Sequence, residues 1–107
     1  MSDWEPVEAR FDDLIHSPNR LRICAALGPA TQLEFTALEE SLGISTSLLS
    51  KQLKLLSDAR YLALEKRPQP FGRPRTWIRL TPRGRQAYLG HVRALRNLTG
   101  DNDKKEN

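Results

Sequence analysis

The sequence predicts a mainly helical α+β domain, with about five helices and a two- or three-stranded antiparallel sheet. Apolar residues recur at helical spacing over most of the chain, two short alternating stretches in the second half are typical of strands, and prolines and glycines separate these segments. With 107 residues, of which 38% are hydrophobic, the chain is long enough for one domain with a modest core. We therefore expect a single domain over residues 1–98 and a disordered tail over residues 99–107.

Two helices are predicted in the N-terminal part. Apolar side chains at helical spacing predict the first helix over residues 4–15, with Pro6 tolerated in its first turn. The second helix begins after Ser17 and Pro18, a cap followed by a first-turn proline, and it ends before the Gly-Pro pair at 28 and 29. Its apolar residues lie on most sides, which predicts that it is buried.

Two further helices follow a short edge strand predicted at residues 32–35. Thr36 and Glu39 have the spacing of a capping box, which predicts a third helix over about residues 36–42 that ends at Gly43. The fourth helix is capped by Ser45 or Thr46 and covers about residues 46–59. Its buried stripe consists of Leu49, Leu53 and Leu56. Only about three residues join the two helices, the spacing of a helix-turn-helix.

The C-terminal part predicts a hairpin and a last helix. "YLALEKR" (61–67) and "RTWIRL" (75–80) alternate apolar and polar residues, and the intervening "PQPFGRP" predicts a stiff, turn-rich tip. Thr81 and Pro82 then open a helix. Its apolar residues at helical spacing are Tyr88, Val92, Leu95 and Leu98.

Charge is distributed unevenly along the chain. Residues 1–50 carry eight acids and three bases, whereas residues 51–100 carry twelve bases and two acids. A basic second half is typical of a protein that binds a polyanion, and an acidic first half argues against indiscriminate binding. A basic surface that is merely solvated is the alternative.

Other classes of function find little support in the sequence. Cys24 is the single cysteine and lies among apolar residues, so we expect a small buried side chain, with a redox role left open. His16 and His91 are far apart in the sequence, which argues against a metal site, and we expect His91 at the surface. No catalytic set or phosphate-binding glycine loop emerges, which predicts a protein that is not an enzyme and has no cofactor. The acidic start and the absence of a long apolar run predict a cytoplasmic protein.

Three segments carry a resemblance to a known family. "LIHSPNRLRICAALG", "FTALEESLGISTSLLSKQLKLLSDARYL" and "GRPRTWIRLTPRGRQAY" resemble the MarR/ArsR-like winged helix-turn-helix transcriptional regulators, notably the small winged helix DNA-binding domain subgroup. The likeness covers roughly residues 11–96. It implies a homodimer that reads an inverted-repeat operator in double-stranded DNA, with helix 46–59 in the major groove and a wing at 67–75 on the backbone or in the minor groove.

The candidate DNA contacts lie on the fourth helix and on the wing. With its leucines facing the core, this helix turns hydroxyls and lysines outward, which suits base edges and phosphates, although solvation alone would also place them there. The candidates are Thr46, Ser47, Ser50, Lys51, Lys54, Arg73 and Arg75. We expect a more distant electrostatic role for Arg79, Arg83 and Arg85.

Four positions need separate comment. Phe71 could stack on a sugar or pack beneath the hairpin, and we expect it to pack; we expect Trp77 to lie in the core. Leu48 could contact a thymine methyl group or fill a gap between helices. Arg60 stands where glycine is common in the family, at a turn that favours a positive φ.

The first and last helices are the candidate dimer contacts. Their apolar stripes are wider than a small core requires. The candidates are Trp4, Val7, Phe11, Leu14, Tyr88, Val92 and Leu95, with packing inside one subunit as the alternative for each. A small-molecule effector is compatible with this architecture, but the sequence does not identify one. The competing function is a winged-helix module that binds an acidic protein partner.

Overall fold

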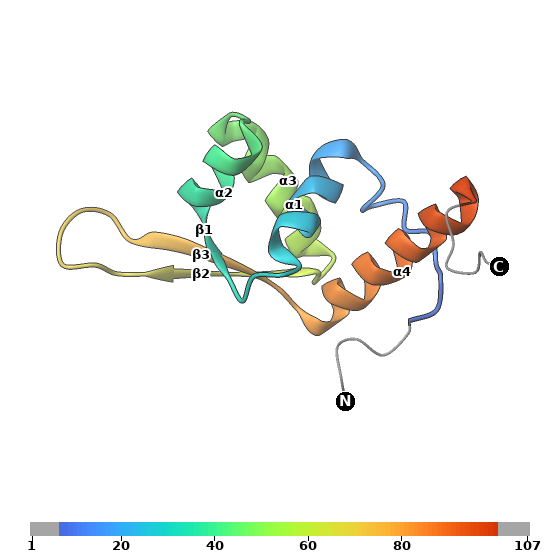
Figure 1. Cartoon of the computed structure of the whole chain (residues 1–107). Coiled ribbons are helices and arrows are strands. Elements are labelled where there is room, and N and C mark those ends of the chain that lie inside the picture. Colours follow the sequence, from blue (N-terminus) through green and yellow to red (C-terminus); the bar gives the residue numbers. More distant parts are fainter. Residues whose placement is uncertain (1–6, 101–107) are drawn as a thin grey trace.

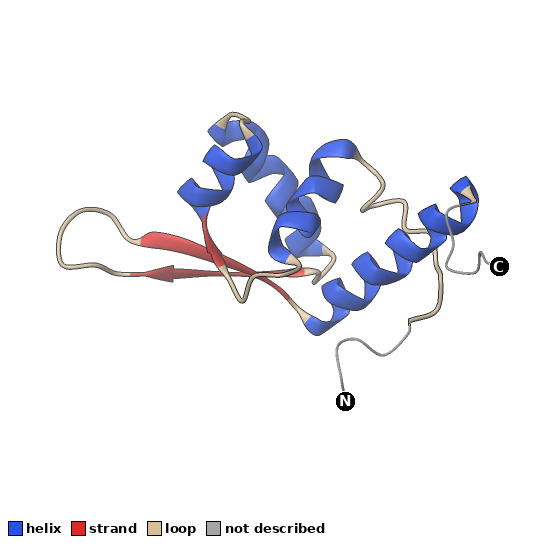
Figure 2. Ribbon diagram, viewed as in Figure 1, coloured by secondary structure: helices blue, strands red, loops and turns tan. Residues whose placement is uncertain are grey.

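The computed structural model describes residues 7–100 as four helices and a three-stranded antiparallel sheet (Figures 1 and 2). The elements are α1 (Pro18–Leu27), β1 (Leu33–Glu34), α2 (Phe35–Leu42), α3 (Thr46–Asp58), β2 (Leu62–Arg67), β3 (Arg75–Leu80) and α4 (Pro82–Thr99). The predicted fold class is confirmed. The predicted tail covers residues 99–107. Its first residue, Thr99, is the last residue of α4, and residues 101–107 lie outside the described part of the chain.

The helix predicted over residues 4–15 does not form in the described residues 7–15, which follow an irregular path alongside α4 (Figure 1). Two of its backbone N–H groups bond to α4, and one local turn forms where the N–H of His16 donates to the carbonyl of Asp12 (2.9 Å). The N–H of Arg10 donates to the carbonyl of Gly90 (3.0 Å), and the N–H of Asp12 donates to His91 Nδ1 (3.0 Å). The apolar residues of this segment contact the rest of the protein without forming a helix. Periodicity alone cannot distinguish such a segment from an amphipathic helix.

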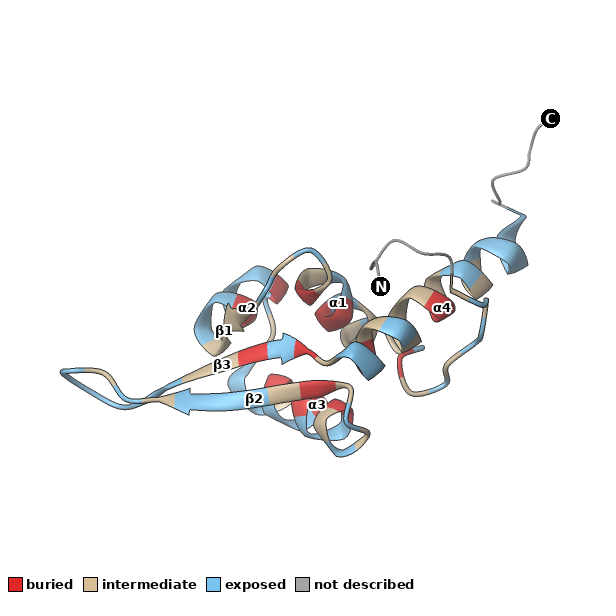
Figure 3. Ribbon diagram, turned by 90° about the horizontal axis from the view of Figure 1, so that it is seen from below, coloured by how far each residue is buried: buried red, intermediate tan, exposed pale blue. Residues whose placement is uncertain are grey.

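The core lies between α1–α3 and the face of the sheet that these helices cover (Figure 3). Leu49, Leu53 and Leu56 are buried, so the predicted stripe of α3 is confirmed. The other buried apolar residues are Ile15, Ile23, Cys24, Leu27, Leu38, Leu42, Leu62, Ile78 and Leu80. Burial of this kind contributes about 25 cal/mol per Å² of apolar surface, which makes this cluster the main source of stability.

β3 is the central strand, with β1 and β2 antiparallel on either side. The register of the β2–β3 hairpin runs from Leu62 opposite Leu80 to Arg67 opposite Arg75. Residues 68–74 form its tip, and we call the hairpin with this tip the wing. It projects beyond the helices and is largely exposed at its outer end (Figures 1 and 3).

Helices α2 and α3 form the predicted helix-turn-helix, joined by residues 43–45. Gly43 has a φ of 65°, a left-handed conformation that glycine adopts without steric cost. The Ser45 hydroxyl caps α3 by accepting from the N–H of Leu48 (3.1 Å). The predicted capping box at Thr36 and Glu39 is wrong. α2 begins one residue earlier than expected, and the Glu39 carboxylate instead accepts a hydrogen bond from the Thr46 hydroxyl.

Two close contacts join α3 and the wing to α4. Arg60 follows α3 with a φ of 67°, so the turn keeps a positive φ although a non-glycine residue stands there. The hydroxyl of Thr81 donates to the carbonyl of Arg60 (2.7 Å), and Thr81 also caps α4. A Cβ at Gly84 would lie 2.1 Å from the carbonyl oxygen of Tyr61, so the start of α4 can approach this turn only with glycine at that position. None of the helices in the described residues is both long and apolar enough to cross a membrane.

Candidate nucleic-acid interface

The outer face of α3 carries all five of its predicted contact residues, and every one of them is exposed. They are Thr46, Ser47, Ser50, Lys51 and Lys54. Lys51 forms no ion pair within the described residues. Lys54 Nζ lies 3.3 Å from Asp58 Oδ2, but both side chains are more than half exposed, so this contact is weak and can be exchanged for another anion. Leu48 is half-buried.

A groove separates α3 from the wing. Its volume is about 560 Å³, and we call it the α3–wing groove. Its walls include Ser50 and Lys54 from α3 and Lys66 and Thr76 from the wing. Sequence reasoning missed Lys66, although the alternation of β2 places it on the same face as Leu62 and Leu64, toward α3. The groove therefore brings the polar face of α3 and the base of the wing into one continuous surface.

The two wing arginines that were predicted to contact DNA, Arg73 and Arg75, differ in their hydrogen-bond partners. The guanidinium of Arg73 has no hydrogen-bond partner among the described side chains, and the residue is exposed at the tip. Arg75 Nη1 instead lies 3.0 Å from Glu34 Oε1, and its Nε donates to Gln69 Oε1 (2.6 Å). Gln69 also donates from Nε2 to the Arg73 carbonyl (2.7 Å), which links the two sides of the tip. Glu34, Gln69, Arg73 and Arg75 line a hollow of about 370 Å³ at the base of the wing, the wing hollow.

Arg67 packs on the hairpin instead of projecting from it. Its guanidinium lies 5.1 Å from the ring centre of Trp77 and donates to Gln32 Oε1 (2.7 Å) and Glu65 Oε1 (3.0 Å). The hydrogen bond that Glu65 accepts from Arg67, together with the charge of Arg67, lowers the pKa of Glu65. Trp77 is half-buried under the guanidinium, and the alternation of β3 places it on the opposite face of the sheet from the buried Ile78 and Leu80, so the expectation that it lies in the core is wrong.

The prediction that Phe71 packs beneath the hairpin is wrong. Its side chain is 88% exposed, because residues 68–74 extend beyond the helices and no element lies under them (Figure 1). An exposed aromatic ring at the tip is available to a partner.

Several other arginines stabilise the fold. Arg22 donates to the carbonyl of Leu42 (2.9 Å), Arg85 donates to that of Gly28 (2.9 Å), and Arg20 donates to Gln52 Oε1 (2.7 Å). Arg79 and Arg83 are exposed. A distant electrostatic role stays a prediction for Arg79, Arg83 and Arg85, of which Arg85 also stabilises the fold through its hydrogen bond to Gly28.

The expectation that His91 lies at the surface is also wrong, because the residue is fully buried. Its Nδ1 accepts from the Asp12 N–H, which places the proton of the neutral ring on Nε2, 3.2 Å from His16 Nδ1. The ring of Phe11 covers both imidazoles, with centroid distances of 4.7 Å to His16 and 4.8 Å to His91. Burial and the neighbouring His16 lower the pKa of His91, against the opposing charges of Asp12 and Asp13.

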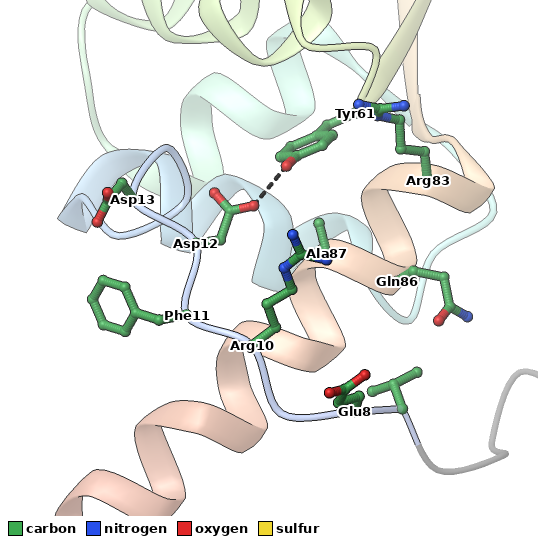
Figure 4. Close-up of a pocket in the computed structure, with 10 residues that line it drawn as sticks. Glu8, Arg10, Phe11, Asp12, Asp13, Tyr61, Arg83, Gln86 and Ala87 are labelled. Atoms are coloured by element: carbon green, nitrogen blue, oxygen red, sulfur yellow. Dashed lines mark hydrogen bonds between the residues drawn. The ribbon is translucent and has the colours of Figure 1, made fainter.

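A polar pocket of about 500 Å³ lies between residues 7–13, the start of α4 and Tyr61 (Figure 4). The Tyr61 hydroxyl donates to Asp12 Oδ2 (2.6 Å), which ties the irregular N-terminal segment to the turn that follows α3. Burial, together with the hydrogen bond and charge of Asp12, raises the pKa of Tyr61 to about 12. Arg10 and Arg83 also line this pocket.

The predicted dimer residues fall into three groups. Trp4 lies outside the described residues, and Leu14 and Tyr88 pack against the core of their own chain. Val7, Val92 and Leu95 are half-buried, and Phe11 is 43% exposed. Sequence reasoning did not include Leu98 in the interface, although its side chain is 72% exposed. A shallow apolar hollow, which we call the α4 patch, is lined by Ala9, Phe11, Ala94, Asn97 and Leu98.

Cys24 is buried, as predicted, and burial together with the charge of Asp12 raises the pKa of its thiol to about 12. It is therefore protonated near neutral pH and a poor nucleophile. Within residues 7–100, no three histidine, cysteine or acidic side chains are grouped so that they could hold a metal ion.

Solved structures of transcriptional regulators share this fold. The transcriptional regulator homologue from Pyrococcus horikoshii OT3 is 21% identical with a TM-score of 0.75, over 85% of this chain and 89% of that one. NadR, solved in complex with 4-hydroxyphenylacetate, is 21% identical with a TM-score of 0.67, over 81% and 60%. The repressor BigR from Xylella fastidiosa is 24% identical with a TM-score of 0.57, over 87% and 83%. No curated protein sequence matches significantly.

The family is identified by a direct sequence match. The profile of the winged helix DNA-binding domain family matches residues 19–99, which include all four helices but for the first residue of α1, the helix-turn-helix and the wing. Since this match covers well over half of the chain, the protein belongs to the winged helix DNA-binding domain family.

Proposed function

We propose that this protein is a DNA-binding transcriptional regulator that acts as a homodimer on an inverted-repeat operator. One observation carries the proposal. The exposed hydroxyls and lysines of α3 continue through the α3–wing groove into a basic wing, so that major-groove and backbone contacts can be made from the same side. With DNA as its partner, the protein is expected in the cytoplasm.

Helix α3 is the proposed reading element. Ser47 and Ser50 have short hydroxyls suited to base edges, and Lys51 and Lys54 reach phosphates or the acceptors of guanine. Thr46 starts the helix, and its hydroxyl bonds to Glu39, so we assign it a positioning role at the groove. These side chains lie on the face of α3 opposite its buried leucines, so the packing of the leucines in the core turns them toward solvent.

The wing is the proposed backbone or minor-groove element. Arg73 is unpaired among the described side chains and projects from a tip stiffened by prolines, so it is the stronger of the two candidate arginines. Arg75 contributes through Nη2, the guanidinium nitrogen that neither Glu34 nor Gln69 contacts.

Dimerisation is proposed through the α4 patch together with the half-buried Val92 and Leu95. A dimer doubles the number of bases read and matches a two-fold symmetric operator. If an effector acts on the protein, the polar pocket at Tyr61 is its proposed place, because it adjoins the end of the reading helix; NadR provides a precedent for a small aromatic acid on this fold.

The alternative is a winged-helix module whose basic face binds an acidic protein. In that case DNA binding would be weak and indifferent to sequence. The exposed Phe71 at the wing tip is compatible with this alternative, because an apolar ring is a common anchor in protein interfaces.

Selection of duplexes from a random pool by the purified protein separates the two functions. A regulator enriches an inverted repeat that it prefers by at least ~10³ over scrambled DNA at moderate salt. The absence of enrichment, with binding that vanishes as salt rises, would transfer support to the protein-binding module.

Lys51→Ala combined with Lys54→Ala tests α3 directly. We expect operator binding to weaken by at least about tenfold and the salt dependence of log K to flatten by about 2, because two cationic contacts are lost. Thermal unfolding should be unchanged, since both side chains are exposed.

The matched control is Arg93→Ala combined with Arg96→Ala. It removes the same charge from exposed positions on the half of α4 that lies far from the wing (Figure 1). Equal weakening by both pairs, with the control sedimenting as the parent does, would mean that net charge, and not contact with α3, governs binding; a shift toward monomer would instead trace the loss to the adjoining α4 patch.

A further inference from the structure

Glu34 is an acid within the basic surface of the wing. It is the last residue of β1 and pairs with Trp77 on β3. It also occupies the N-cap position of α2, but its side chain forms no capping hydrogen bond with that helix. Its carboxylate instead contacts the guanidinium of Arg75, with an Oε1–Nη1 distance of 3.0 Å. The side chain of Glu34 is 17% exposed and that of Arg75 is 53% exposed, so the acid lies behind the base.

The contacts of Arg75 limit what it can offer to a phosphate. A two-pronged grip on phosphate uses either Nε with Nη2 or Nη1 with Nη2, the two edges of the planar guanidinium. Gln69 Oε1 already bonds Nε at 2.6 Å, and Glu34 already bonds Nη1. Nε has a single N–H, so Gln69 blocks the edge formed by Nε and Nη2, whereas Glu34 takes one of the two N–H groups of Nη1. The two contacts hold the guanidinium in place, and the carboxylate of Glu34 partly neutralises its charge.

Of the two residues that bind the Arg75 guanidinium, Glu34 and Gln69, Glu34 competes more strongly with a phosphate. Its hydrogen bond is charge-assisted, whereas the one from Gln69 is neutral. Release of Arg75 would also leave a carboxylate that is mostly shielded from water without its cation, which is costly. A backbone phosphate must therefore compete with an anion that is already in place.

We propose that Glu34 sets the strength of DNA binding, because its carboxylate neutralises and holds Arg75 and so weakens the contact of this cation with a backbone phosphate. This inference rests on the DNA-binding function proposed above and assigns to it a residue that limits affinity. Phosphate contacts contribute equally on all sequences, so a restrained Arg75 lowers binding to non-operator DNA and leaves the base contacts of α3 to decide the preferred site.

Glu34→Gln in the full chain tests the inference. Glutamine keeps the size of the side chain and weakens its hold on Arg75. We expect binding to both the selected duplex and a scrambled duplex to tighten by about 10-fold, the lower end of the range for one hydrogen bond to a charged group. Glu40→Gln is the control, because Glu40 is exposed on α2 and forms no ion pair in the described part of the chain. It measures the general gain from removing one negative charge.

The partner of Glu34 is identified by combining substitutions. The gain from Glu34→Gln should disappear when Arg75→Gln is present and should persist when Arg73→Gln is present, because only Arg75 contacts the acid. Thermal unfolding of each variant verifies folding, and Glu34→Ser, which supplies α2 with a favourable cap, replaces the glutamine variant if that unfolds.

The outcomes separate this inference from the proposed function. If the parent binds DNA and Glu34→Gln does no more than Glu40→Gln, or if the gain survives Arg75→Gln, the role of Glu34 is refuted and DNA binding stands. If neither the parent nor any variant binds duplex DNA, the proposed function fails, and the role of Glu34 fails with it.

Discussion

His91 joins the N-terminal segment to α4 through both nitrogens of a buried ring. Nδ1 accepts from the Asp12 backbone, and Nε2 lies 3.2 Å from His16. Protonation would place a hydrogen on Nδ1, against the N–H that already donates there. Because burial disfavours the charged ring, protonation of His91 should weaken the attachment of residues 10–16 to α4.

Stability should therefore fall as the pH falls. Burial lowers the pKa of folded His91 below its ordinary value near 6.5, so in this region the unfolded chain binds the proton more readily. The contribution is fully present above about pH 7 and is lost as the pH falls through 6.5 toward the lower folded pKa. His91→Asn keeps an acceptor near Nδ1 but cannot titrate. Urea unfolding at pH 7 and pH 5 should show a smaller loss of stability in this variant than in the parent.

His16→Asn is the comparison for this measurement. It removes a charge beside His91 but leaves burial, the larger cause of the lowered pKa. It should retain most of the pH dependence. Equal pH dependence in the parent and His91→Asn would show that carboxylates, and not this ring, control stability in acid.

At the scale of elements, the end of α3 is held in a strained turn. Arg60 has a φ of 67°, a region that costs a side chain with a Cβ about 1–2 kcal/mol. The turn persists because neighbouring groups hold it. The Tyr61 N–H bonds to the Leu56 carbonyl (3.0 Å), and the Arg60 carbonyl accepts from Thr81. The direction of the chain from the reading helix into the wing depends on this turn.

Arg60→Gly should raise the free energy of unfolding by about 0.5–1 kcal/mol. Glycine removes the strain, which outweighs the entropy it adds to the unfolded chain. Arg60→Ala keeps a Cβ and should change stability little, which makes it the matched control for loss of the exposed side chain. Chemical denaturation compares the two, and a glycine variant no more stable than the alanine variant would mean that the turn is not strained.

The elements with local signals were predictable from the sequence, and those fixed by distant contacts were not. The stripe of α3, the turn at Gly43 and the two wing strands follow from spacing and turn chemistry over a few residues. The N-terminal segment has equally good helical spacing, yet its N–H groups bond to Gly90 and His91, about eighty residues away in the sequence. No local pattern carries that information.

The candidate site divides in the same way. Exposure of Lys51 and Lys54 follows from the helical period of the buried leucines. The restraint of Arg75 by Glu34 does not, because the two residues are brought together by the pairing of β1 with β3. Burial of His91 was missed for a related reason, since its partners come from the segment that was expected to be a helix.

At the scale of the whole molecule, the reading surface and the α4 patch lie at opposite ends (Figure 1). The wing projects to one end, and α3 lies between it and α4 (Figure 1). The far half of α4 and the segment packed on it form the other, where Phe11 and Leu98 are exposed. Self-association through this second end would leave both reading surfaces free, as a two-fold symmetric operator requires.

Leu98→Glu should shift the protein toward monomer. The side chain is 72% exposed in the single chain, so the substitution should leave the monomer fold intact, whereas a carboxylate buried in an apolar interface without a partner is costly. Sedimentation velocity over a range of concentrations measures the change. Binding to the inverted repeat should weaken more than binding to a single half-site, because only the former gains from two linked subunits.

Phe71→Glu is the matched control. It introduces the same charge at an exposed apolar residue, 88% exposed, on the wing tip at the opposite end of the molecule. It should sediment as the parent does, although it should bind DNA less tightly, since a negative charge there repels phosphate. A Leu98→Glu protein that also sediments as the parent does would exclude the α4 patch as the dimer contact and would direct attention to the half-buried Val92 and Leu95.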